Sequence, residues 1–245
     1  MGILGGEQKA DKTIKAVAFD LDGTLYPNYR LYYRLFPQVF LHPFFSKAFM
    51  KVRRQLHCSV KPGEMAAPDR SFYEKQLSLL ASMIKKDRES TRQKLDRLIY
   101  GNLEKHFSRI KLFPGVKETL AAFRSAELRL AVLSDFPPMQ KIELLGLSSF
   151  FDCTLSTEET GYLKPSGIPF AALADALKLK PENILYVGNS PRFDAEGAVS
   201  SGMKAALIRR GVFSTGYARN TGGADFVFRN YRQLQEYVLR QAGGK

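Results

Sequence analysis

The chain has 245 residues, of which 44% are apolar and 12% aromatic, a composition typical of a globular protein and not of a disordered one. Its two cysteines, Cys58 and Cys153, have no metal-binding spacing and form no disulfide framework, which favours a reducing compartment. No apolar run is long enough to span a membrane, and the first eleven residues lack the apolar core of a signal peptide. We therefore expect a cytoplasmic protein with no membrane partner.

The positive charge is concentrated in one segment. The formal net charge is +13, and residues 27–111 contain 18 Lys and Arg against 7 Asp and Glu, a surplus of +11. A basic segment near a site raises the local concentration of an anionic substrate. Nucleic acid is the alternative partner, but no nucleic-acid-binding motif accompanies the charge. We expect a small anionic substrate, and the oligomeric state is not predicted.

Taken in chain order, the sequence predicts a poorly ordered lead-in over 1–14, a buried strand over 15–20 and then helices from 27 to 111. Apolar side chains recur at helical spacing from Tyr32 to Phe40, resume after Pro43, and continue over 72–85 and 90–107. An aromatic cluster at the start of this segment is interpreted as helix core in preference to the lining of a substrate pocket. Its members are Tyr26, Tyr29, Tyr32, Tyr33 and Phe36.

Strands and helices alternate after residue 112. Helices are predicted over 116–125, 139–145, 169–177 and 231–239, and strands over 128–133, 151–156, 183–187, 205–208 and 225–228. This alternation predicts an α/β fold with a doubly wound parallel sheet. We expect two domains, an α/β core over 1–26 and 112–245 and a smaller all-helical domain over 27–111.

Two aspartates, Asp20 and Asp22, directly follow the first predicted strand, where the sites of open α/β sheets gather. Residues two apart on a strand share a face, and two carboxylates held close together repel each other unless a cation or a proton intervenes. Their oxygens suit Mg2+, and such a pair can supply a nucleophile and a general acid and base. A solvated turn is the plainer interpretation of the pair, so its meaning depends on phosphate-binding groups elsewhere.

Four segments resemble, in order, the four motifs of the haloacid dehalogenase-like hydrolase superfamily. They are FDLDGTLY, LAVLSDF, GYLKPSGIPF and ILYVGNSPRFDAEGA, and they span Phe19 to Ala198. The resemblance implies a Rossmann-like core with a helical cap inserted between the first and second motifs, where it closes over the site and excludes water. It also implies a Mg2+-dependent phosphatase that forms an aspartyl-phosphate. Dehalogenase and phosphonatase members generally lack an aspartate at the position of Asp22, whereas a phosphomutase uses the same aspartates and stays an alternative.

The resemblance also implies a role for each motif residue. Asp20 is the nucleophile, Asp22 is the general acid and base, and Ser134 and Lys164 bind the phosphoryl oxygens and complete the catalytic set. Substrate contacts are expected from Ser134, Asp135, Lys164 and Thr24. The implied Mg2+ ligands are Asp20, Asp22 through its carbonyl, Asn189 and Asp194.

Asn189 departs from the family pattern, which usually has an aspartate there. Its amide oxygen can still bind Mg2+, but without a charge we expect the metal to bind roughly tenfold more weakly. Either the site works with this neutral ligand or it has degraded, in which case the chain is a non-enzymatic binding or regulatory protein. Because the other motif residues are present, we favour a working site that acts on a small phosphorylated metabolite such as a nucleotide or sugar phosphate.

Overall fold

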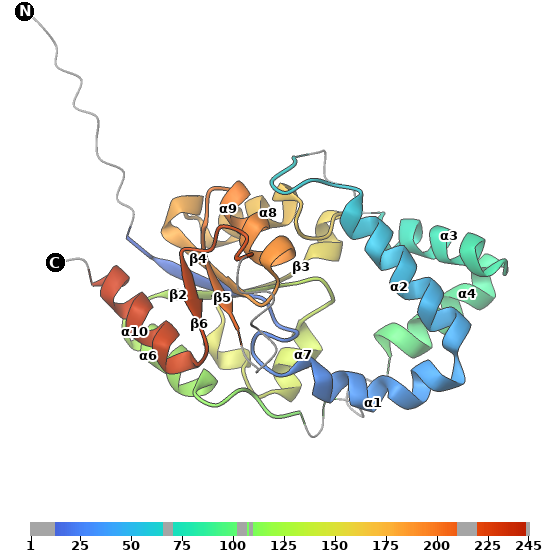
Figure 1. Cartoon of the computed structure of the whole chain (residues 1–245), viewed down its shortest axis with the longest axis horizontal. Helices are drawn as coiled ribbons and strands as arrows, with labels where there is room; N and C mark the ends of the chain where they lie inside the picture. The colour runs from blue at the N-terminus through green and yellow to red at the C-terminus, as the bar shows by residue number, and fades with distance from the viewer. Residues whose placement is uncertain (1–12, 66–70, 102–106, 108–109, 210–219, 244–245) are drawn as a thin grey trace, which may run out of the picture.

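The computed structural model describes residues 13–65, 71–101, 107, 110–209 and 220–243, without the side chains of 31–35, 38 and 39. Within these residues six parallel strands form one sheet in the order β3-β2-β1-β4-β5-β6 (Figure 1). The strands are β1 (Ala16–Phe19), β2 (Arg129–Ser134), β3 (Cys153–Ser156), β4 (Ile184–Gly188), β5 (Lys204–Ile208) and β6 (Phe226–Phe228). This topology confirms the predicted doubly wound α/β fold.

The central strand β1 pairs with β2 on one side and with β4 on the other. The chain therefore leaves β1 in one direction, through β2 and β3, and returns to begin the other half of the sheet at β4. Such a reversal is where open α/β sheets bind their ligands, beyond the carboxyl ends of the strands. Asp20 follows β1 and Asn189 follows β4, so both lie at this point.

Two helical layers cover the sheet because its buried side chains alternate between its faces. Val17 and Phe19 of β1 belong to one apolar core, and Ala16 and Ala18 belong to the other. Residues of α6 (Val116–Ser125), α7 (Met139–Leu144) and α10 (Tyr231–Ala242) complete the first core. Residues of α8 (Gly167–Leu177) and α9 (Gly197–Ser200) complete the second.

Four helices lie beside the sheet, to the right in Figure 1. They are α1 (Asn28–Leu41), α2 (Pro43–Cys58), α3 (Phe72–Ile84) and α4 (Arg88–Leu95), and a π-helical turn over Asp96–Tyr100 follows α4. Apolar side chains of α2, α3 and α4 form a third core, in which Val52, Leu77 and Leu80 are fully buried. Leu163, from the chain segment that follows β3, also packs into this core and ties it to the sheet.

The predicted elements agree with the structure to within a few residues, with two exceptions. Ile14 is buried in the first core instead of belonging to a loose lead-in. Among the described members of the aromatic cluster, Tyr29 and Phe36 are exposed and Tyr26 is buried, so the helix-core interpretation is wrong for Tyr29 and Phe36. The Tyr32 and Tyr33 side chains lie outside the described residues, as do residues 102–106 of the helix predicted over 90–107.

Among the described residues, no helix has both the length and the apolar character needed to cross a bilayer.

Candidate active site

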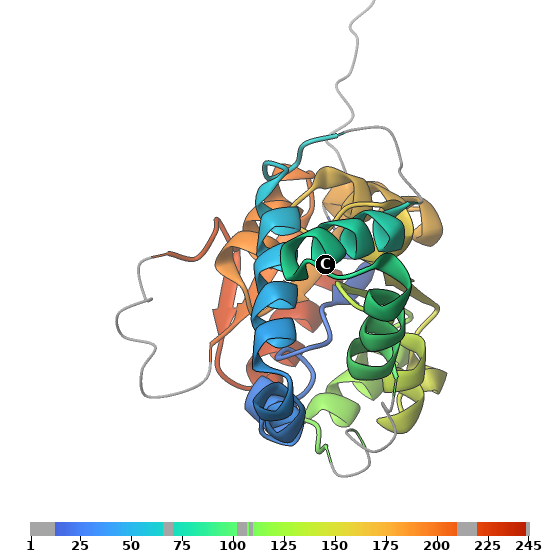
Figure 2. The same cartoon turned by 90° about the vertical axis from the view of Figure 1, so that its right-hand side faces the viewer.

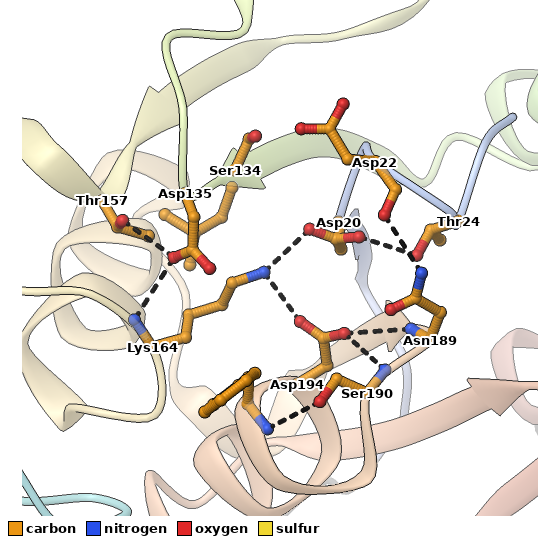
Figure 3. Close-up of polar contacts among 12 residues, drawn as sticks. Asp20, Asp22, Thr24, Ser134, Asp135, Thr157, Lys164, Asn189, Ser190 and Asp194 are labelled. Atoms are coloured by element: carbon orange, nitrogen blue, oxygen red, sulfur yellow. Dashed lines mark hydrogen bonds and ion pairs between the residues drawn. The ribbon is translucent and has the colours of Figure 1, made fainter. Parts of the chain in front are cut away.

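Asp20 and Asp22 follow β1 but turn their carboxylates to different partners (Figure 3). Thr24 Oγ1 donates to Asp20 Oδ2 at 2.8 Å, and Lys164 Nζ donates to Asp20 Oδ1 at 2.8 Å. The Asp22 carboxylate instead accepts hydrogen bonds from Lys141 and from the Tyr26 hydroxyl. The expectation that the two carboxylates share a strand face is wrong, because β1 ends at Phe19 and both aspartates lie beyond it.

Lys164 joins the first and fourth motifs. Its side chain is 2% exposed, and Nζ lies 2.8 Å from Asp20 Oδ1, 2.7 Å from Asp194 Oδ1 and 3.1 Å from the Tyr186 hydroxyl. Burial lowers the pKa of Lys164, but the charges of Asp194 and Asp20 outweigh burial and hold that pKa well above its usual value. The ammonium group therefore stays charged between the two carboxylates.

Asp194 is fixed from its other side by the turn that follows β4. Its Oδ2 accepts the backbone N–H groups of Asn189, at 2.9 Å, and of Ser190, at 2.8 Å. A Cβ atom on Gly188 would lie 2.4 Å from Asp194 Cγ, so the carboxylate packs against a backbone that only glycine leaves open. The glycine of this motif thus serves to place an acidic group beside Lys164.

Asn189 contacts the first motif directly. Its Nδ2 donates to the backbone carbonyl of Asp22 at 3.0 Å. Gly23 makes room for this contact, because a Cβ atom there would lie 1.9 Å from Asn189 Nδ2. Gly23 also has a φ of +92°, which disfavours other residues. The amide of Asn189 and the carbonyl of Asp22, two of the predicted Mg2+ ligands, are therefore neighbours.

The second motif enters the site from the end of β2. Ser134 is buried, and its Oγ accepts the backbone N–H of Phe136 at 3.3 Å. The Asp135 carboxylate accepts hydrogen bonds from the Thr157 hydroxyl, at 3.0 Å, and from the backbone N–H of Lys164, at 3.3 Å. Asp135 therefore braces the backbone of Lys164, and its predicted contact with substrate stays a prediction.

Burial controls the charge of the predicted nucleophile. Burial raises the pKa of Asp20, Lys164 lowers it and Asp194 raises it again, and together they bring it to about 7. The charged groups of the described site, some buried and some half-buried, comprise more acids than bases. The carboxylates are Asp20, Asp22, Asp135, Glu158 and Asp194, and the cations are Arg53, Lys141 and Lys164. With all of these groups ionised, the described site has two more negative than positive charges, which a divalent cation would balance.

Lys141 on α7 was not predicted from the sequence. Its side chain is buried, and Nζ lies 2.9 Å from Asp22 Oδ1 and 2.7 Å from Oδ2. The same ammonium group lies 5.3 Å from the ring centre of Phe136 and 5.7 Å from that of Phe107. A lysine at this position of an amphipathic helix looks solvated in the sequence, so no local signal reveals its contact with Asp22.

Two residues of α2 reach the site from the helical layer, and neither was predicted. Arg53 is buried, pairs with Glu158 and donates to the backbone carbonyl of Asp135 at 2.7 Å. His57 Nδ1 lies 2.7 Å from the backbone carbonyl of Lys164, and burial lowers the pKa of this histidine. Their four-residue spacing places both side chains on one helix face, but it does not reveal their partners.

The comparisons with known proteins agree with this geometry. The family described as haloacid dehalogenase-like hydrolase matches residues 14–202. A glyceraldehyde 3-phosphate phosphatase of Methanopyrus kandleri is 30% identical over 240 residues, which cover 94% of this chain and 99% of that protein. Two solved structures share the fold. A phosphatase of this superfamily from Thermococcus onnurineus has a TM-score of 0.60 at 24% identity, covering 92% of this chain and 98% of its own.

The second structure is the L-2-haloacid dehalogenase of Xanthobacter autotrophicus with covalently bound chloropropionic acid. It has a TM-score of 0.59 at 20% identity, covering 92% of this chain and 98% of its own. Fold similarity alone therefore does not separate the two chemistries. The family match covers most of the chain and includes all four motifs that meet at Lys164 and Asn189. The chain belongs to the haloacid dehalogenase-like hydrolases.

Proposed function

We propose that this chain is a Mg2+-dependent phosphatase that hydrolyses small phosphomonoesters through an aspartyl-phosphate on Asp20. The observation that carries the proposal is the setting of the Asp20 carboxylate. It is buried, with one oxygen on the Thr24 hydroxyl and the other on the ammonium group of Lys164. A carboxylate fixed in this way and deprived of water is oriented to attack an electrophile.

The proposed reaction has two steps. An Asp20 oxygen attacks phosphorus and forms a P–O bond, the bond to the leaving alcohol breaks, and Asp22 gives a proton to the departing oxygen. Water then attacks phosphorus, Asp22 takes its proton, and the Asp20 carboxylate and inorganic phosphate are restored. Lys164 and Ser134 bind the phosphoryl oxygens in both steps. This role of Asp22 favours a phosphatase over a dehalogenase, because a halide leaves without a proton.

The donor atoms suit Mg2+. They are the carboxylates of Asp20 and Asp194, the carbonyl of Asp22 and the amide oxygen of Asn189, all of them hard oxygen ligands. Asn189 Nδ2 lies 3.0 Å from the Asp22 carbonyl, and rotation of the amide would place Oδ1 there instead. The amide oxygen and the Asp22 carbonyl could then bind Mg2+ together. When bound, Mg2+ would offset the negative charge of the site and of the phosphoryl group.

We further propose that residues 27–111 form a cap domain, and that 1–26 and 112–245 form the core. The third apolar core, to which α2, α3 and α4 contribute, supports this division. Arg53 and His57 support a closing role, because they connect α2 to the backbones of Asp135 and Lys164. A cap in this place would exclude water from Asp20 and select the leaving group.

The substrate class follows from the site and from the relatives. Three buried cations, Arg53, Lys141 and Lys164, lie in the site, each paired with a carboxylate, and together with the proposed Mg2+ they would suit a small anion. The printed name of the Methanopyrus kandleri relative is glyceraldehyde 3-phosphate phosphatase. We propose small sugar phosphates as the first class to examine, followed by nucleotides.

The first test measures phosphate release from an aryl phosphate with and without Mg2+. The wild type is compared with Asp20→Asn and with Asp175→Asn, a matched control at an exposed position of α8. We expect turnover by the wild type and the control that requires Mg2+, and none by Asp20→Asn. Turnover by Asp20→Asn would refute the assigned nucleophile. No turnover across a panel of phosphate esters would favour the non-enzymatic alternative.

The second test examines the intermediate. Acid quenching during turnover, followed by peptide mass spectrometry, should find one added phosphoryl group on the peptide that contains Asp20. A phosphomutase would give the same adduct, but it would return the phosphoryl group to a sugar instead of releasing inorganic phosphate. Product analysis with sugar phosphates therefore separates the two activities.

A further inference from the structure

The exposed apolar side chains gather on one part of the molecule. Of the ten large apolar side chains that are exposed among the described residues, six lie between Tyr29 and Met50. Where α1 turns into α2, Phe40 is 73% exposed, Leu41 71% and Phe44 88%, and the Phe36 ring stacks on that of Phe40. We name Phe36, Phe40, Leu41 and Phe44 the apolar corner. Side chains of this size rarely gather in water without a partner.

A basic stripe continues from the apolar corner along α2. Lys47, Lys51 and Arg54 are exposed. They follow Phe44 at intervals of three, four and three residues, which places them on one helix face. The buried side chains of α2, among them Val52 and Leu56, occupy another face. Helices α1 and α2 together contain six Lys and Arg and no Asp or Glu. Figure 2 shows the course of α2, with α1 at one end of it.

The basic stripe lies on a different face of α2 from the residues that contact the site. Arg53 and His57, which contact Asp135 and Lys164, lie about 100° around the helix from the centre of the stripe. A second copy of the chain is also a poor partner. A symmetric contact would set two basic stripes against each other, with no acidic side chain on either helix to pair with them.

We propose that the apolar corner and the basic stripe together dock on an anionic lipid surface. Phe40, Leu41 and Phe44 would enter the boundary between headgroups and acyl chains, and Lys47, Lys51 and Arg54 would contact the anionic headgroups. This combination of exposed aromatic and aliphatic side chains with basic charge that no acidic residue of α1 or α2 offsets matches such a surface. The binding is peripheral and reversible. It revises the sequence-based expectation of no membrane partner, and it does not depend on the proposed catalytic function.

The test is flotation of the full chain with vesicles of phosphatidylcholine and phosphatidylserine, beside vesicles of phosphatidylcholine alone. We expect binding to the anionic vesicles only, and loss of binding in high salt. The double variant Lys47→Glu, Lys51→Glu should weaken binding at least about 25-fold, since each basic residue near the surface contributes roughly fivefold. The double variant Phe40→Ser, Phe44→Ser should also weaken it, because the apolar insertion is lost.

A matched control separates this surface from net charge. Lys117→Glu, Lys180→Glu makes the same charge change at exposed positions elsewhere and should bind vesicles like the wild type. Equal weakening by this control, or no binding by the wild type at low salt, overturns the proposal. So does a dimer that Phe40→Ser, Phe44→Ser dissociates while vesicles stay unbound. Binding of an oligonucleotide, lost on charge reversal but kept in the serine variant, would identify nucleic acid as the partner instead.

Discussion

Lys141 Nζ lies 2.7 Å from Oδ2 and 2.9 Å from Oδ1 of Asp22, so a buried ammonium group engages both oxygens of the predicted general acid. The Tyr26 hydroxyl donates to the same carboxylate. An aspartate that gives a proton to one oxygen and takes a proton from another, as proposed for Asp22, gains from such orientation. Lys141 is therefore a candidate positioning residue, which acts through Asp22 and lies outside the four motifs.

Replacing this lysine should impair proton transfer selectively. We expect Lys141→Met to lower kcat for an alkyl phosphate about tenfold to a hundredfold, part of what a general acid contributes. An aryl phosphate, whose leaving group needs little protonation, should be affected less. Steady-state kinetics on both substrates checks this, with Lys180→Met as the control at an exposed site. Equal losses on the two substrates would argue for a purely structural role.

Replacing Lys164 should make folding depend on a cation. Asp20 and Asp194 share its ammonium group, so Lys164→Met leaves two buried carboxylates without it. We expect the free energy of unfolding to fall by about 3–5 kcal/mol in EDTA. Added Mg2+ should restore part of it, because the ion supplies the missing charge. Denaturant unfolding with and without Mg2+ measures both effects.

The control for this experiment is Arg232→Met, which breaks the exposed pair of Arg232 with Glu236. Exposed ion pairs contribute little to the free energy of unfolding, so we expect no measurable change in it for Arg232→Met. A Lys164→Met variant as stable as the wild type would mean that Asp20 and Asp194 become protonated or hydrated when the lysine is absent.

The motif residues could be predicted because each depends on a local pattern. A short apolar run followed by Asp20 or Asn189 specifies a strand end, and parallel strands bring their carboxyl ends to the same edge. The meeting of Asp20, Lys164 and Asp194 follows from topology together with the family resemblance. Sequence periodicity alone leaves the same aspartates as plausible turn residues.

The other contacts of the site could not be predicted, because they join residues that are distant in the sequence. Arg53 meets Glu158 across more than one hundred positions, and Lys141 meets Asp22 across a similar separation. Helical periodicity indicates that a face is apolar or basic, but not what covers it. The same limit explains why Tyr29 and Phe36 were wrongly predicted to belong to a helix core. Both lie on a helix, but their side chains are exposed.

Restoring the charge at Asn189 should strengthen metal binding. Asn189→Asp replaces a neutral ligand with a carboxylate beside the Asp22 carbonyl, and we expect roughly tenfold tighter Mg2+ binding. At saturating Mg2+ the tighter binding adds about 1.4 kcal/mol to the free energy of unfolding of the variant. In EDTA the variant should be less stable than the wild type, because it loses the amide donor and adds a negative charge. Thermal melts over a Mg2+ series test this, with the exposed Asn220→Asp as control.

The raised pKa of Asp20 predicts how stability depends on pH in the absence of metal. With a pKa of about 7 in the folded chain and 3.8 as the ordinary value, the native state binds more protons than the unfolded state between these limits. The stability that Asp20 contributes is therefore complete below pH 3.8 and is lost as the pH rises through about 7. Asp20→Asn does not titrate, so it should melt progressively higher than the wild type as the pH rises from 4 to 8.

Differential melting of the two proteins in EDTA measures this effect, and Asp175→Asn corrects for the loss of an ordinary exposed carboxylate. A constant difference across the pH range would show that Asp20 ionises normally in the folded chain. Mg2+ should reduce the pH-dependent difference, because a cation beside Asp20 favours its charged form and lowers its pKa. Burial of the ionised Asp20 carboxylate thus lowers the stability of the fold without metal, whereas with metal the same carboxylate is expected to react. Such an opposition between stability and function is expected of a buried nucleophile.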